Sequence, residues 1–309
     1  MKQMALASNK TVVIVLGPTA AGKTSAAIQL ATTFKTEIIS ADSRQCFKEL
    51  SIGVARPSEK ELQTIEHYFI ASHSVYDDVS AGAFEQYALQ KVNKIFRTHN
   101  VAIMVGGTGL YIRAFCEGMD EIPAVPADIR NSIMLNYEKN GLEWLKQETQ
   151  KKDPVFYETG EIQNPQRLMR ALEVAETTGQ SILTFRRGKK AERDFNIVKI
   201  GLELPKEELH RNIDARVDKM IAVGLVDEAR RLLPYRHLNA LQTVGYTEMF
   251  DYLDGKLSLE EATELIKKNT RQYAKRQMTW FKKDKDVRWI DARKCDIAVL
   301  SGLIGSVSA

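Results

Sequence analysis

The chain has 309 residues, 44% of them hydrophobic and 27% charged, with a formal net charge of +4 at pH 7; it is therefore globular rather than largely disordered. This charge is too small to identify a polyanionic partner from the total alone. No uncharged apolar stretch approaches about 18 residues, residues 1–10 hold no long apolar core, and the three cysteines form no C-x-x-C pair, so we expect a reduced, cytoplasmic protein without a membrane segment or zinc site.

Short apolar runs alternate with helical patterns along the chain. The runs need not alternate in polarity, because parallel strands are covered on both faces. The expected strands are Val12–Leu16, Thr36–Ala41, His67–Ala71, Val101–Val105, Asn196–Leu202 and Val287–Ile290, and the expected helices include Lys23–Phe34, Leu209–Met220, Leu225–Leu233, Thr243–Leu253 and Leu257–Lys283. The opening order of strand, helix and strand predicts an α/β fold with a ligand at the carboxyl ends of the strands.

The pattern changes between about residues 115 and 190. Strands disappear there, charges of both signs alternate, and prolines separate segments with helical spacing. We expect a helical insertion over residues 115–190. The α/β core is then formed by residues 1–114 and 191–309, with helices at its C-terminal end.

The first expected strand leads into a phosphate-binding motif. The run Gly17-Pro18-Thr19-Ala20-Ala21-Gly22-Lys23-Thr24 matches G-x-x-x-x-G-K-[ST] at every specified position. Its glycines let backbone N–H groups converge on an anion, Lys23 adds a positive charge, and the Thr24 hydroxyl suits Mg²⁺. We predict a phosphate-loop parallel sheet, similar to that of P-loop NTPases. The motif leaves open which phosphate is bound.

A second candidate site follows the second expected strand. The run Asp42-Ser43-Arg44-Gln45 lies where that strand ends, at the same edge of the sheet as the phosphate motif. Asp42 is therefore a candidate general base or metal partner in the cleft. The alternative is that Asp42 only caps the turn that follows, since Asp and Ser are both good capping residues.

The third long strand ends in Gly106-Gly107-Thr108-Gly109. Three glycines around one threonine predict a close backbone approach and a hydroxyl at the same edge of the sheet. A phosphate-loop ATPase usually carries an acidic residue at the end of such a strand to organise Mg²⁺ and water. Glycines take that place here, which makes ATP hydrolysis a less favoured interpretation.

The last long helix combines an apolar stripe with a basic face. The stripe is Ile266, Tyr273 and Trp280, and the roughly opposite face carries Lys268, Arg271, Lys275 and Lys282. Residues 267–276 contain no acidic residue, which favours contact with a nucleic-acid phosphate backbone. The alternative is an ordinary solvated amphipathic helix.

In this order, the motifs resemble those of one family, the bacterial tRNA dimethylallyltransferases, also called tRNA isopentenyltransferases. The resemblance spans nearly the whole chain and rests on Gly17–Thr24, Asp42–Gln45, Gly106–Ile112, Asn164–Arg167, Arg170–Val174, Arg216-Val217, Gly245-Tyr246, and Arg271–Gln277 with Thr279–Phe281. It implies an enzyme that transfers the dimethylallyl group of dimethylallyl diphosphate to N6 of the adenosine just 3′ of the anticodon in certain tRNAs, releasing diphosphate.

The resemblance also implies roles for individual residues. Asp42 is the general base that orients and deprotonates the adenine amine, Thr19, Lys23 and Arg216 complete the catalytic set at the diphosphate, and residues 17–24 bind that diphosphate with Mg²⁺ near Thr24. The implied tRNA contacts are Asp42, Ser43, Arg44, Gln45, Thr108, Arg130, Gln166, Arg167, Leu168, Met169 and Arg170, to which the basic helix adds Arg271, Lys275 and Arg276. On this interpretation the insertion clamps the anticodon stem-loop, and the protein is a monomer.

Two alternatives stay open at this stage. An isopentenyltransferase acting on free adenine nucleotides would use the same phosphate motif and base, and a phosphate-loop kinase or ATP-driven RNA-binding protein would use the motif for ATP. The chain departs from the common family pattern at Cys46, Phe47, Val54 and Arg56, none of which is a proposed catalytic group.

Overall fold

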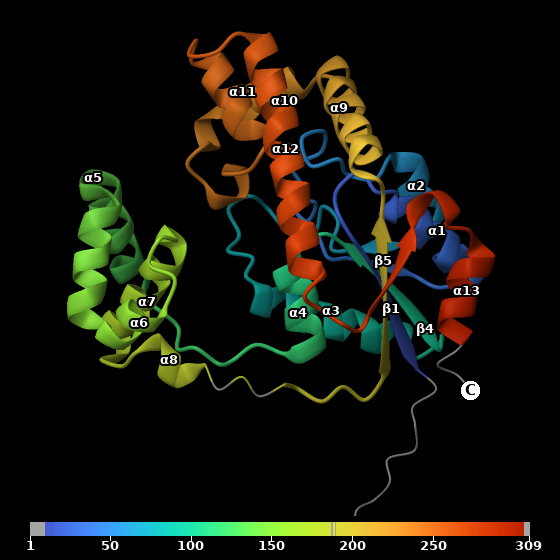
Figure 1. Cartoon of the computed structure of the whole chain (residues 1–309), viewed down its shortest axis with the longest axis horizontal. Helices are drawn as coiled ribbons and strands as arrows, with labels where there is room; N and C mark the ends of the chain where they lie inside the picture. Colours follow the sequence, from blue (N-terminus) through green and yellow to red (C-terminus); the bar gives the residue numbers. More distant parts are fainter. Residues whose placement is uncertain (1–9, 187, 189, 306–309) are drawn as a thin grey trace, which may run out of the picture. The chain divides into compact units, whose positions relative to one another are not determined.

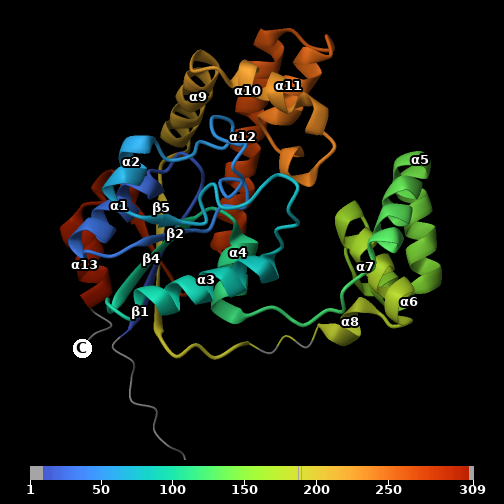
Figure 2. The ribbon, with the colours of Figure 1, turned by 180° about the vertical axis from the view of Figure 1, so that it is seen from behind.

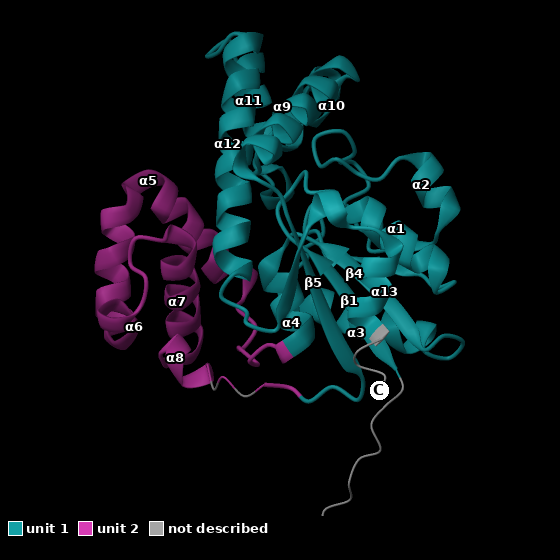
Figure 3. Cartoon of the chain, turned by 45° about the vertical axis from the view of Figure 1, so that its right-hand side comes forward, with its two compact units in different colours: residues 1–116, 192–309 teal, residues 117–191 magenta. Residues whose placement is uncertain are grey.

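The computed structural model describes residues 10–186, 188 and 190–305 (Figure 1). The expectation that residues 1–10 hold no long apolar core therefore concerns, apart from Lys10, residues that lie outside the described part of the chain. Two compact units are present: Met1–Cys116 with Glu192–Ala309, and Glu117–Ala191 (Figure 3). Within the described residues, every helix is too short or too polar to cross a lipid bilayer.

The first unit is built on a sheet of six parallel strands in the order β3-β2-β4-β1-β5-β6. The strands are β1 (Thr11–Leu16), β2 (Ile38–Ser40), β3 (His67–Tyr68), β4 (Val101–Gly106), β5 (Asn196–Glu203) and β6 (Val287–Asp291). All six overlap the predicted apolar runs, and the parallel sheet with its helices confirms the predicted α/β class. Every residue of β1 is buried, as expected for a strand covered on both faces.

Two strands are shorter than predicted. β2 begins at Ile38 because the Thr36 N–H donates to the carbonyl of Ala31 at the end of the first helix, not to a neighbouring strand. β3 ends at Tyr68, since Phe69 (φ 63°) and Ala71 (φ 46°) take left-handed backbone conformations that no strand continues through.

Helices cover both faces of this sheet. Those of the first unit are α1 (Lys23–Thr33), α2 (Glu59–Thr64), α3 (Ala81–Ile95), α4 (Gly109–Glu117), α9 (Lys206–Ala222), α10 (Leu225–Leu232), α11 (Tyr246–Leu253), α12 (Leu259–Phe281) and α13 (Ile297–Gly305). Val13 and Val15 of β1 pack in one apolar core with α1 and α13 (Figure 1). Ile14 and Leu16 pack in the other, with α3 and α4 (Figure 2). The alternation of side chains along one strand thus builds two cores.

The long helix α12 differs from its prediction in which residues pack. Its buried residues are Ala262, Ile266, Ala274, Gln277 and Phe281. Tyr273 and Trp280 are 37% and 38% exposed, so only Ile266 of the predicted apolar stripe is a core residue. A seven-residue spacing places side chains on one face of a helix, but it does not determine what covers that face.

The regular secondary structure of the second unit, within its described residues, is helical. Its helices are α5 (Ala127–Lys152), α6 (Pro154–Thr159), α7 (Pro165–Thr178) and α8 (Ile182–Phe185), and α5 is interrupted at Gly141, where φ is 75°. The unit has its own apolar core. Asp153 joins two of the helices, because its carboxylate accepts from the N–H groups of Phe156 (3.0 Å) and Ile182 (3.1 Å).

One implied tRNA contact is corrected by this packing. Leu168 is fully buried in the core of the second unit, so its side chain cannot face a partner. The neighbouring Asn164-Pro165 pair has a structural reason of its own: Asn164 caps α7 by accepting from the Arg167 N–H at 3.3 Å, and Pro165 occupies the first helical position.

Candidate active site

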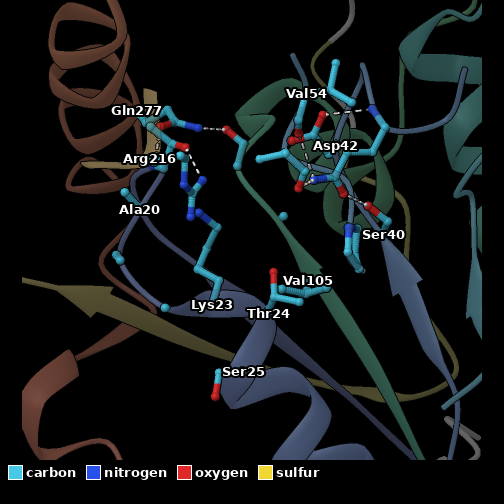
Figure 4. Close-up of a pocket in the computed structure, with 18 of the residues that line it drawn as sticks. Ala20, Lys23, Thr24, Ser25, Ser40, Asp42, Val54, Val105, Arg216 and Gln277 are labelled. Atoms are coloured by element: carbon cyan, nitrogen blue, oxygen red, sulfur yellow. Dashed lines mark hydrogen bonds between the residues drawn. The ribbon is translucent and has the colours of Figure 1, made fainter. Parts of the chain in front are cut away.

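A polar cavity of about 280 Å³ lies at the carboxyl ends of the central strands (Figure 4). Its walls come from the phosphate motif, from the segments after β2 and β4, and from α9 and α12. The lining residues include Thr19–Ser25, Ser40, Asp42, Gln45, His67, Gly106, Gly107, Arg216, Tyr273 and Gln277. Residues as far apart in the sequence as Thr19 and Gln277 thus line one cavity.

The phosphate motif forms a turn that only particular residues allow. Gly17 has φ 138°, and a Cβ there would lie 2.4 Å from the carbonyl oxygen of Leu202 in β5. Gly22, in the left-handed region at φ 84°, is the N-cap of α1 and leaves the first N–H groups of that helix without intrahelical partners. These donors lie beside the cavity, and the helix dipole favours an anion there.

Two cations of the cavity have no carboxylate partner. Lys23 Nζ donates to the Pro18 carbonyl at 2.6 Å, and Arg216 donates to the Thr19 hydroxyl at 3.1 Å. Within the described residues, neither Lys23 nor Arg216 forms an ion pair. Burial, with the charge of Arg216, lowers the pKa of Lys23 to about 7 against the opposing effect of Asp42, and burial also lowers the pKa of Arg216. Such a pair is poised to receive an anion.

Asp42 both caps a turn and faces the cavity. Its Oδ1 accepts from the N–H groups of Arg44 (2.9 Å) and Gln45 (3.3 Å), as in the capping alternative. Its Oδ2 has no hydrogen-bond partner within the described residues, and Asp42 lines the cavity. The two interpretations of this residue are therefore compatible: one oxygen fixes the side chain and the other stays available.

The end of β4 approaches its neighbours as closely as its glycines predict. A Cβ on Gly106, Gly107 or Gly109 would lie 2.2–2.3 Å from an atom of another segment. The Thr108 hydroxyl accepts from the Ser43 N–H at 3.0 Å and lies 3.3 Å from the Ser43 hydroxyl. Thr108 therefore supports the loop that carries Asp42.

Gln277 is a site residue that the sequence did not single out. It is 6% exposed, its Oε1 accepts from the Thr19 N–H at 2.9 Å, and its Nε2 donates to the Gly107 carbonyl at 2.9 Å. Figure 4 shows the Gln277 side chain between the phosphate motif and the segment that follows β4. In the sequence, Gln277 has the helical spacing of the buried residues Ala274 and Phe281. A glutamine at such a position needs buried hydrogen-bond partners, which is the feature that could have indicated its role.

A second cavity of about 200 Å³ adjoins the first, and both are lined by Thr19, Asp42, Val54, Ala55, Arg216 and Tyr273. Its remaining walls combine apolar side chains, Val217, Met220, Val244 and Ile266, with the polar Ser43, Arg44, Thr243 and Thr270. Tyr273 lies between the cavities, and burial and the nearby charge of Asp42 raise its pKa to about 12. An anion cradle and a partly apolar cavity thus adjoin at the Asp42 carboxylate.

Other residues implied by the resemblance are not among those that line this cavity. In the second unit, Arg130 and Arg170 approach the carboxylate of Glu173 at 3.6 and 3.1 Å, and Arg167 pairs with Glu161 at 2.5 Å. Gln166 is exposed and Met169 is half-buried.

The predicted basic residues of α12 differ among themselves. Arg271 is held in an ion pair with Asp214. Lys275 and Arg276 are exposed, and the Arg276 guanidinium lies 5.8 Å from the centre of the Tyr273 ring.

The cavity residues fit a metal of the Mg²⁺ type only in part. The Thr24 hydroxyl lines the cavity and has no hydrogen-bond partner in the described chain, and Asp42 offers a carboxylate oxygen. No group of three or more His, Cys, Asp or Glu residues that could hold a metal is present among the described residues. Mg²⁺ is commonly bound by few protein oxygens together with substrate phosphates and water, which this arrangement allows.

Comparisons with known proteins agree with one another. Residues 45–284 match the model of the IPP transferase family. The chain is 48% identical to the tRNA dimethylallyltransferase of Christiangramia forsetii over 277 residues, which cover 90% of this chain and 92% of that protein. It is 47% identical to that of Cytophaga hutchinsonii over 281 residues, covering 91% and 92%.

Solved structures give the same result. The tRNA isopentenylpyrophosphate transferase from Bacillus halodurans superimposes with a TM-score of 0.70 at 32% identity, over 97% of both chains. A eukaryotic dimethylallyltransferase acting on tRNA superimposes with a TM-score of 0.78 at 26% identity, over 96% of this chain and 78% of that chain.

Proposed function

The chain belongs to the tRNA dimethylallyltransferase family, and we propose from this that it transfers the dimethylallyl group of dimethylallyl diphosphate to N6 of the adenosine 3′ of the anticodon in tRNA. The observation that carries the proposal is the shared cavity: the phosphate motif and Asp42, with one free carboxylate oxygen, line the same 280 Å³ space. The apolar side chains in the wall of the adjoining cavity, among them Val217, Met220 and Ile266, offer a surface for a small hydrocarbon group.

In the proposed reaction the C–O bond of the donor breaks and its electron pair leaves with the diphosphate. The amine N6 supplies the electron pair of the new C–N bond, and its proton passes to Asp42 Oδ2. The two N–H donors at Oδ1 hold the carboxylate in place for this transfer. Asp42 is thus proposed to be the general base.

The phosphate motif is proposed to stabilise the leaving group. The N–H groups at the start of α1, with Lys23 and Arg216, act on the negative charge that develops on the diphosphate. The Thr19 hydroxyl, which accepts from Arg216, lines the same cavity and is proposed to lie beside the diphosphate. Bound at the Thr24 hydroxyl and the diphosphate oxygens, Mg²⁺ would neutralise part of that charge.

The tRNA is proposed to bind through basic residues of both units. In the second unit these are the exposed Arg130 and Arg167 and the half-buried Arg170, with Gln166 and Met169 beside them, and in α12 they are the exposed Lys275 and Arg276. The adenine amine cannot react within a stacked anticodon loop, so the nucleotide must be turned out of the stack to reach Asp42. We propose a monomeric, cytoplasmic enzyme.

One experiment separates this function from its alternatives. The purified protein is incubated with Mg²⁺ and labelled dimethylallyl diphosphate, together with either bulk tRNA or AMP. We expect label in tRNA, at the adenosine next to the anticodon, and none in AMP. Label in AMP alone would establish a free-nucleotide isopentenyltransferase, and label in neither would refute prenyl transfer.

A further inference from the structure

One peptide group of the phosphate motif is held at both of its polar atoms. The carbonyl of Pro18 accepts from Lys23 Nζ at 2.6 Å, and the N–H of Thr19, in the same peptide group, donates to Gln277 Oε1 at 2.9 Å. The first bond is local, whereas the second joins residues 258 positions apart. The orientation of this peptide is therefore set by a lysine of α1 and a glutamine of α12.

The glutamine is itself fixed. Its Nε2 donates to the Gly107 carbonyl at 2.9 Å, so both polar atoms of the amide are used. A Cβ on Gly107 would lie 2.2 Å from this nitrogen, so the absence of a side chain there makes the contact possible. With 6% exposure, Gln277 has no water shell to replace these two bonds.

Anion binding affects the two hydrogen bonds of the Pro18–Thr19 peptide group differently, because only one of them is made by Lys23. A phosphate oxygen competes with the Pro18 carbonyl for the Lys23 ammonium, and where the ammonium turns to the phosphate, that carbonyl loses its charged partner. The peptide group is then held through the Thr19 N–H alone. Rotation of this group would carry the Thr19 hydroxyl away from Arg216, whose guanidinium donates to it at 3.1 Å.

We propose that Gln277 is a positioning residue for the diphosphate. It holds the Pro18–Thr19 peptide group while Lys23 exchanges the Pro18 carbonyl for a phosphate oxygen, and so keeps Thr19 and Arg216 in place around the anion. The inference rests on the proposed function in taking a diphosphate as the ligand. It adds a residue of α12 to the diphosphate site.

The test measures binding of inorganic diphosphate with Mg²⁺ by calorimetry, using the full chain. Gln277→Met has nearly the same volume and neither hydrogen bond, and we expect its affinity to be weaker by about five- to tenfold, the size of one such bond. The KM for dimethylallyl diphosphate should rise by a similar factor, with tRNA affinity within twofold. Gln90→Met, the same change at an exposed position of α3, is the control and should leave all three values unchanged.

A second readout separates positioning from a general loss of structure. We expect amide hydrogen exchange at Thr19 in the wild-type protein to stay slow with and without diphosphate. In Gln277→Met it should become faster, most of all when diphosphate is bound and Lys23 has left Pro18. Faster exchange throughout α12, equal in both states, would indicate a structural role and overturn the proposal.

A variant that leaves the glutamine unchanged provides an independent check. Gly107→Ala places a Cβ against Gln277 Nε2 and should displace the amide, with the same weakening of diphosphate binding. Diphosphate affinity within twofold of wild type in folded Gln277→Met or folded Gly107→Ala would refute the inference. Tight diphosphate binding by a wild-type protein that transfers no prenyl group would refute the proposed function and leave this inference standing.

Discussion

The positive charges around the cavity and those on the molecular surface are held in opposite ways. Lys23 and Arg216 lie in the cavity wall, bound to a carbonyl and a hydroxyl and to no carboxylate within the described chain. Arg271 of α12 and Arg170 of the second unit each lie against a carboxylate, those of Asp214 and Glu173. Both sets look alike as basic residues in the sequence.

The presence or absence of a carboxylate partner indicates which cations gain most from binding an anion. Placing a cation in a partly desolvated site without a counter-charge costs free energy, and the lowered pKa of Lys23 reflects that cost. A bound anion supplies the missing counter-charge and so offsets this free-energy cost. A surface arginine already paired with a carboxylate gains much less from a second anion, since it must share or give up its partner.

The largest expected effect is at Asp42, the acidic residue beside both cavity cations. Asp42→Ala should lower kcat for prenyl transfer by about 10²- to 10⁴-fold, the usual contribution of a general base. Binding of tRNA should stay within a few-fold of wild type, as measured by filter binding. Full activity of this variant would exclude Asp42 as the base.

A second test removes one of the unpaired cations. Lys23→Met should weaken binding of the diphosphate donor by about 10- to 100-fold, the range of a charge-assisted hydrogen bond. It should also unfold at a slightly higher temperature near neutral pH, because it no longer holds an ammonium group in a partly desolvated site without a counter-charge. A variant that binds the donor as tightly as wild type would break the proposed contrast between buried and surface cations.

The same lysine gives the donor affinity a pH dependence. The pKa of Lys23 in the free protein is about 7, and a bound anion raises it, so binding above pH 7 takes up a proton. The donor is by then fully ionised, because a phosphate loses its last proton near about pH 6. Wild-type affinity should therefore fall as the pH rises from 7 to 9, and Lys23→Met should show no such fall.

A smaller effect is expected from Lys275 and Arg276, two exposed cations of α12 that form no ion pair with the described residues. Replacing Lys275 and Arg276 together by Gln should weaken tRNA binding several-fold, and the slope of log affinity against log salt should shrink by about 1 to 2. Affinity for inorganic diphosphate is the control and should not change. An unaltered salt slope would show that this face is merely solvated.

The smallest effect is expected at Arg271, on the same helix. Its guanidinium is held by Asp214, so Arg271→Gln should leave the salt slope of tRNA binding nearly unchanged. The free energy of unfolding should fall by no more than about 1 kcal/mol, as for other partly exposed ion pairs. A loss of salt slope as large as that of the double variant would show that tRNA displaces Asp214.

Local patterns were enough to predict the sheet and the phosphate motif. Buried parallel strands are continuous apolar runs, and the cradle needs its glycines, lysine and threonine in one short segment, so both can be recognised from neighbouring residues. Strand ends were less well predicted, because the left-handed conformations of Phe69 and Ala71 follow from tertiary packing.

Features that depend on distant partners were missed or wrong. Gln277 bonds to residues 258 and 170 positions away, and nothing near it in the sequence indicates either. Tyr273 and Trp280 have the spacing of a packed stripe, yet Tyr273 lines two cavities and Trp280 lies over Gly109. Leu168 was assigned by its place in a family motif, which did not distinguish a core residue from a contact residue.

The bond between Thr19 and Gln277 joins an early and a late part of the chain as it is synthesised. The phosphate motif leaves the ribosome early, whereas the glutamine that completes it lies near the end of the sequence. The strand β5, which pairs with β1, likewise follows only after the helical second unit has been made. A nascent chain that has formed its first strand and helix therefore still lacks the Gln277 contact, which we expect to form only when the final long helix docks.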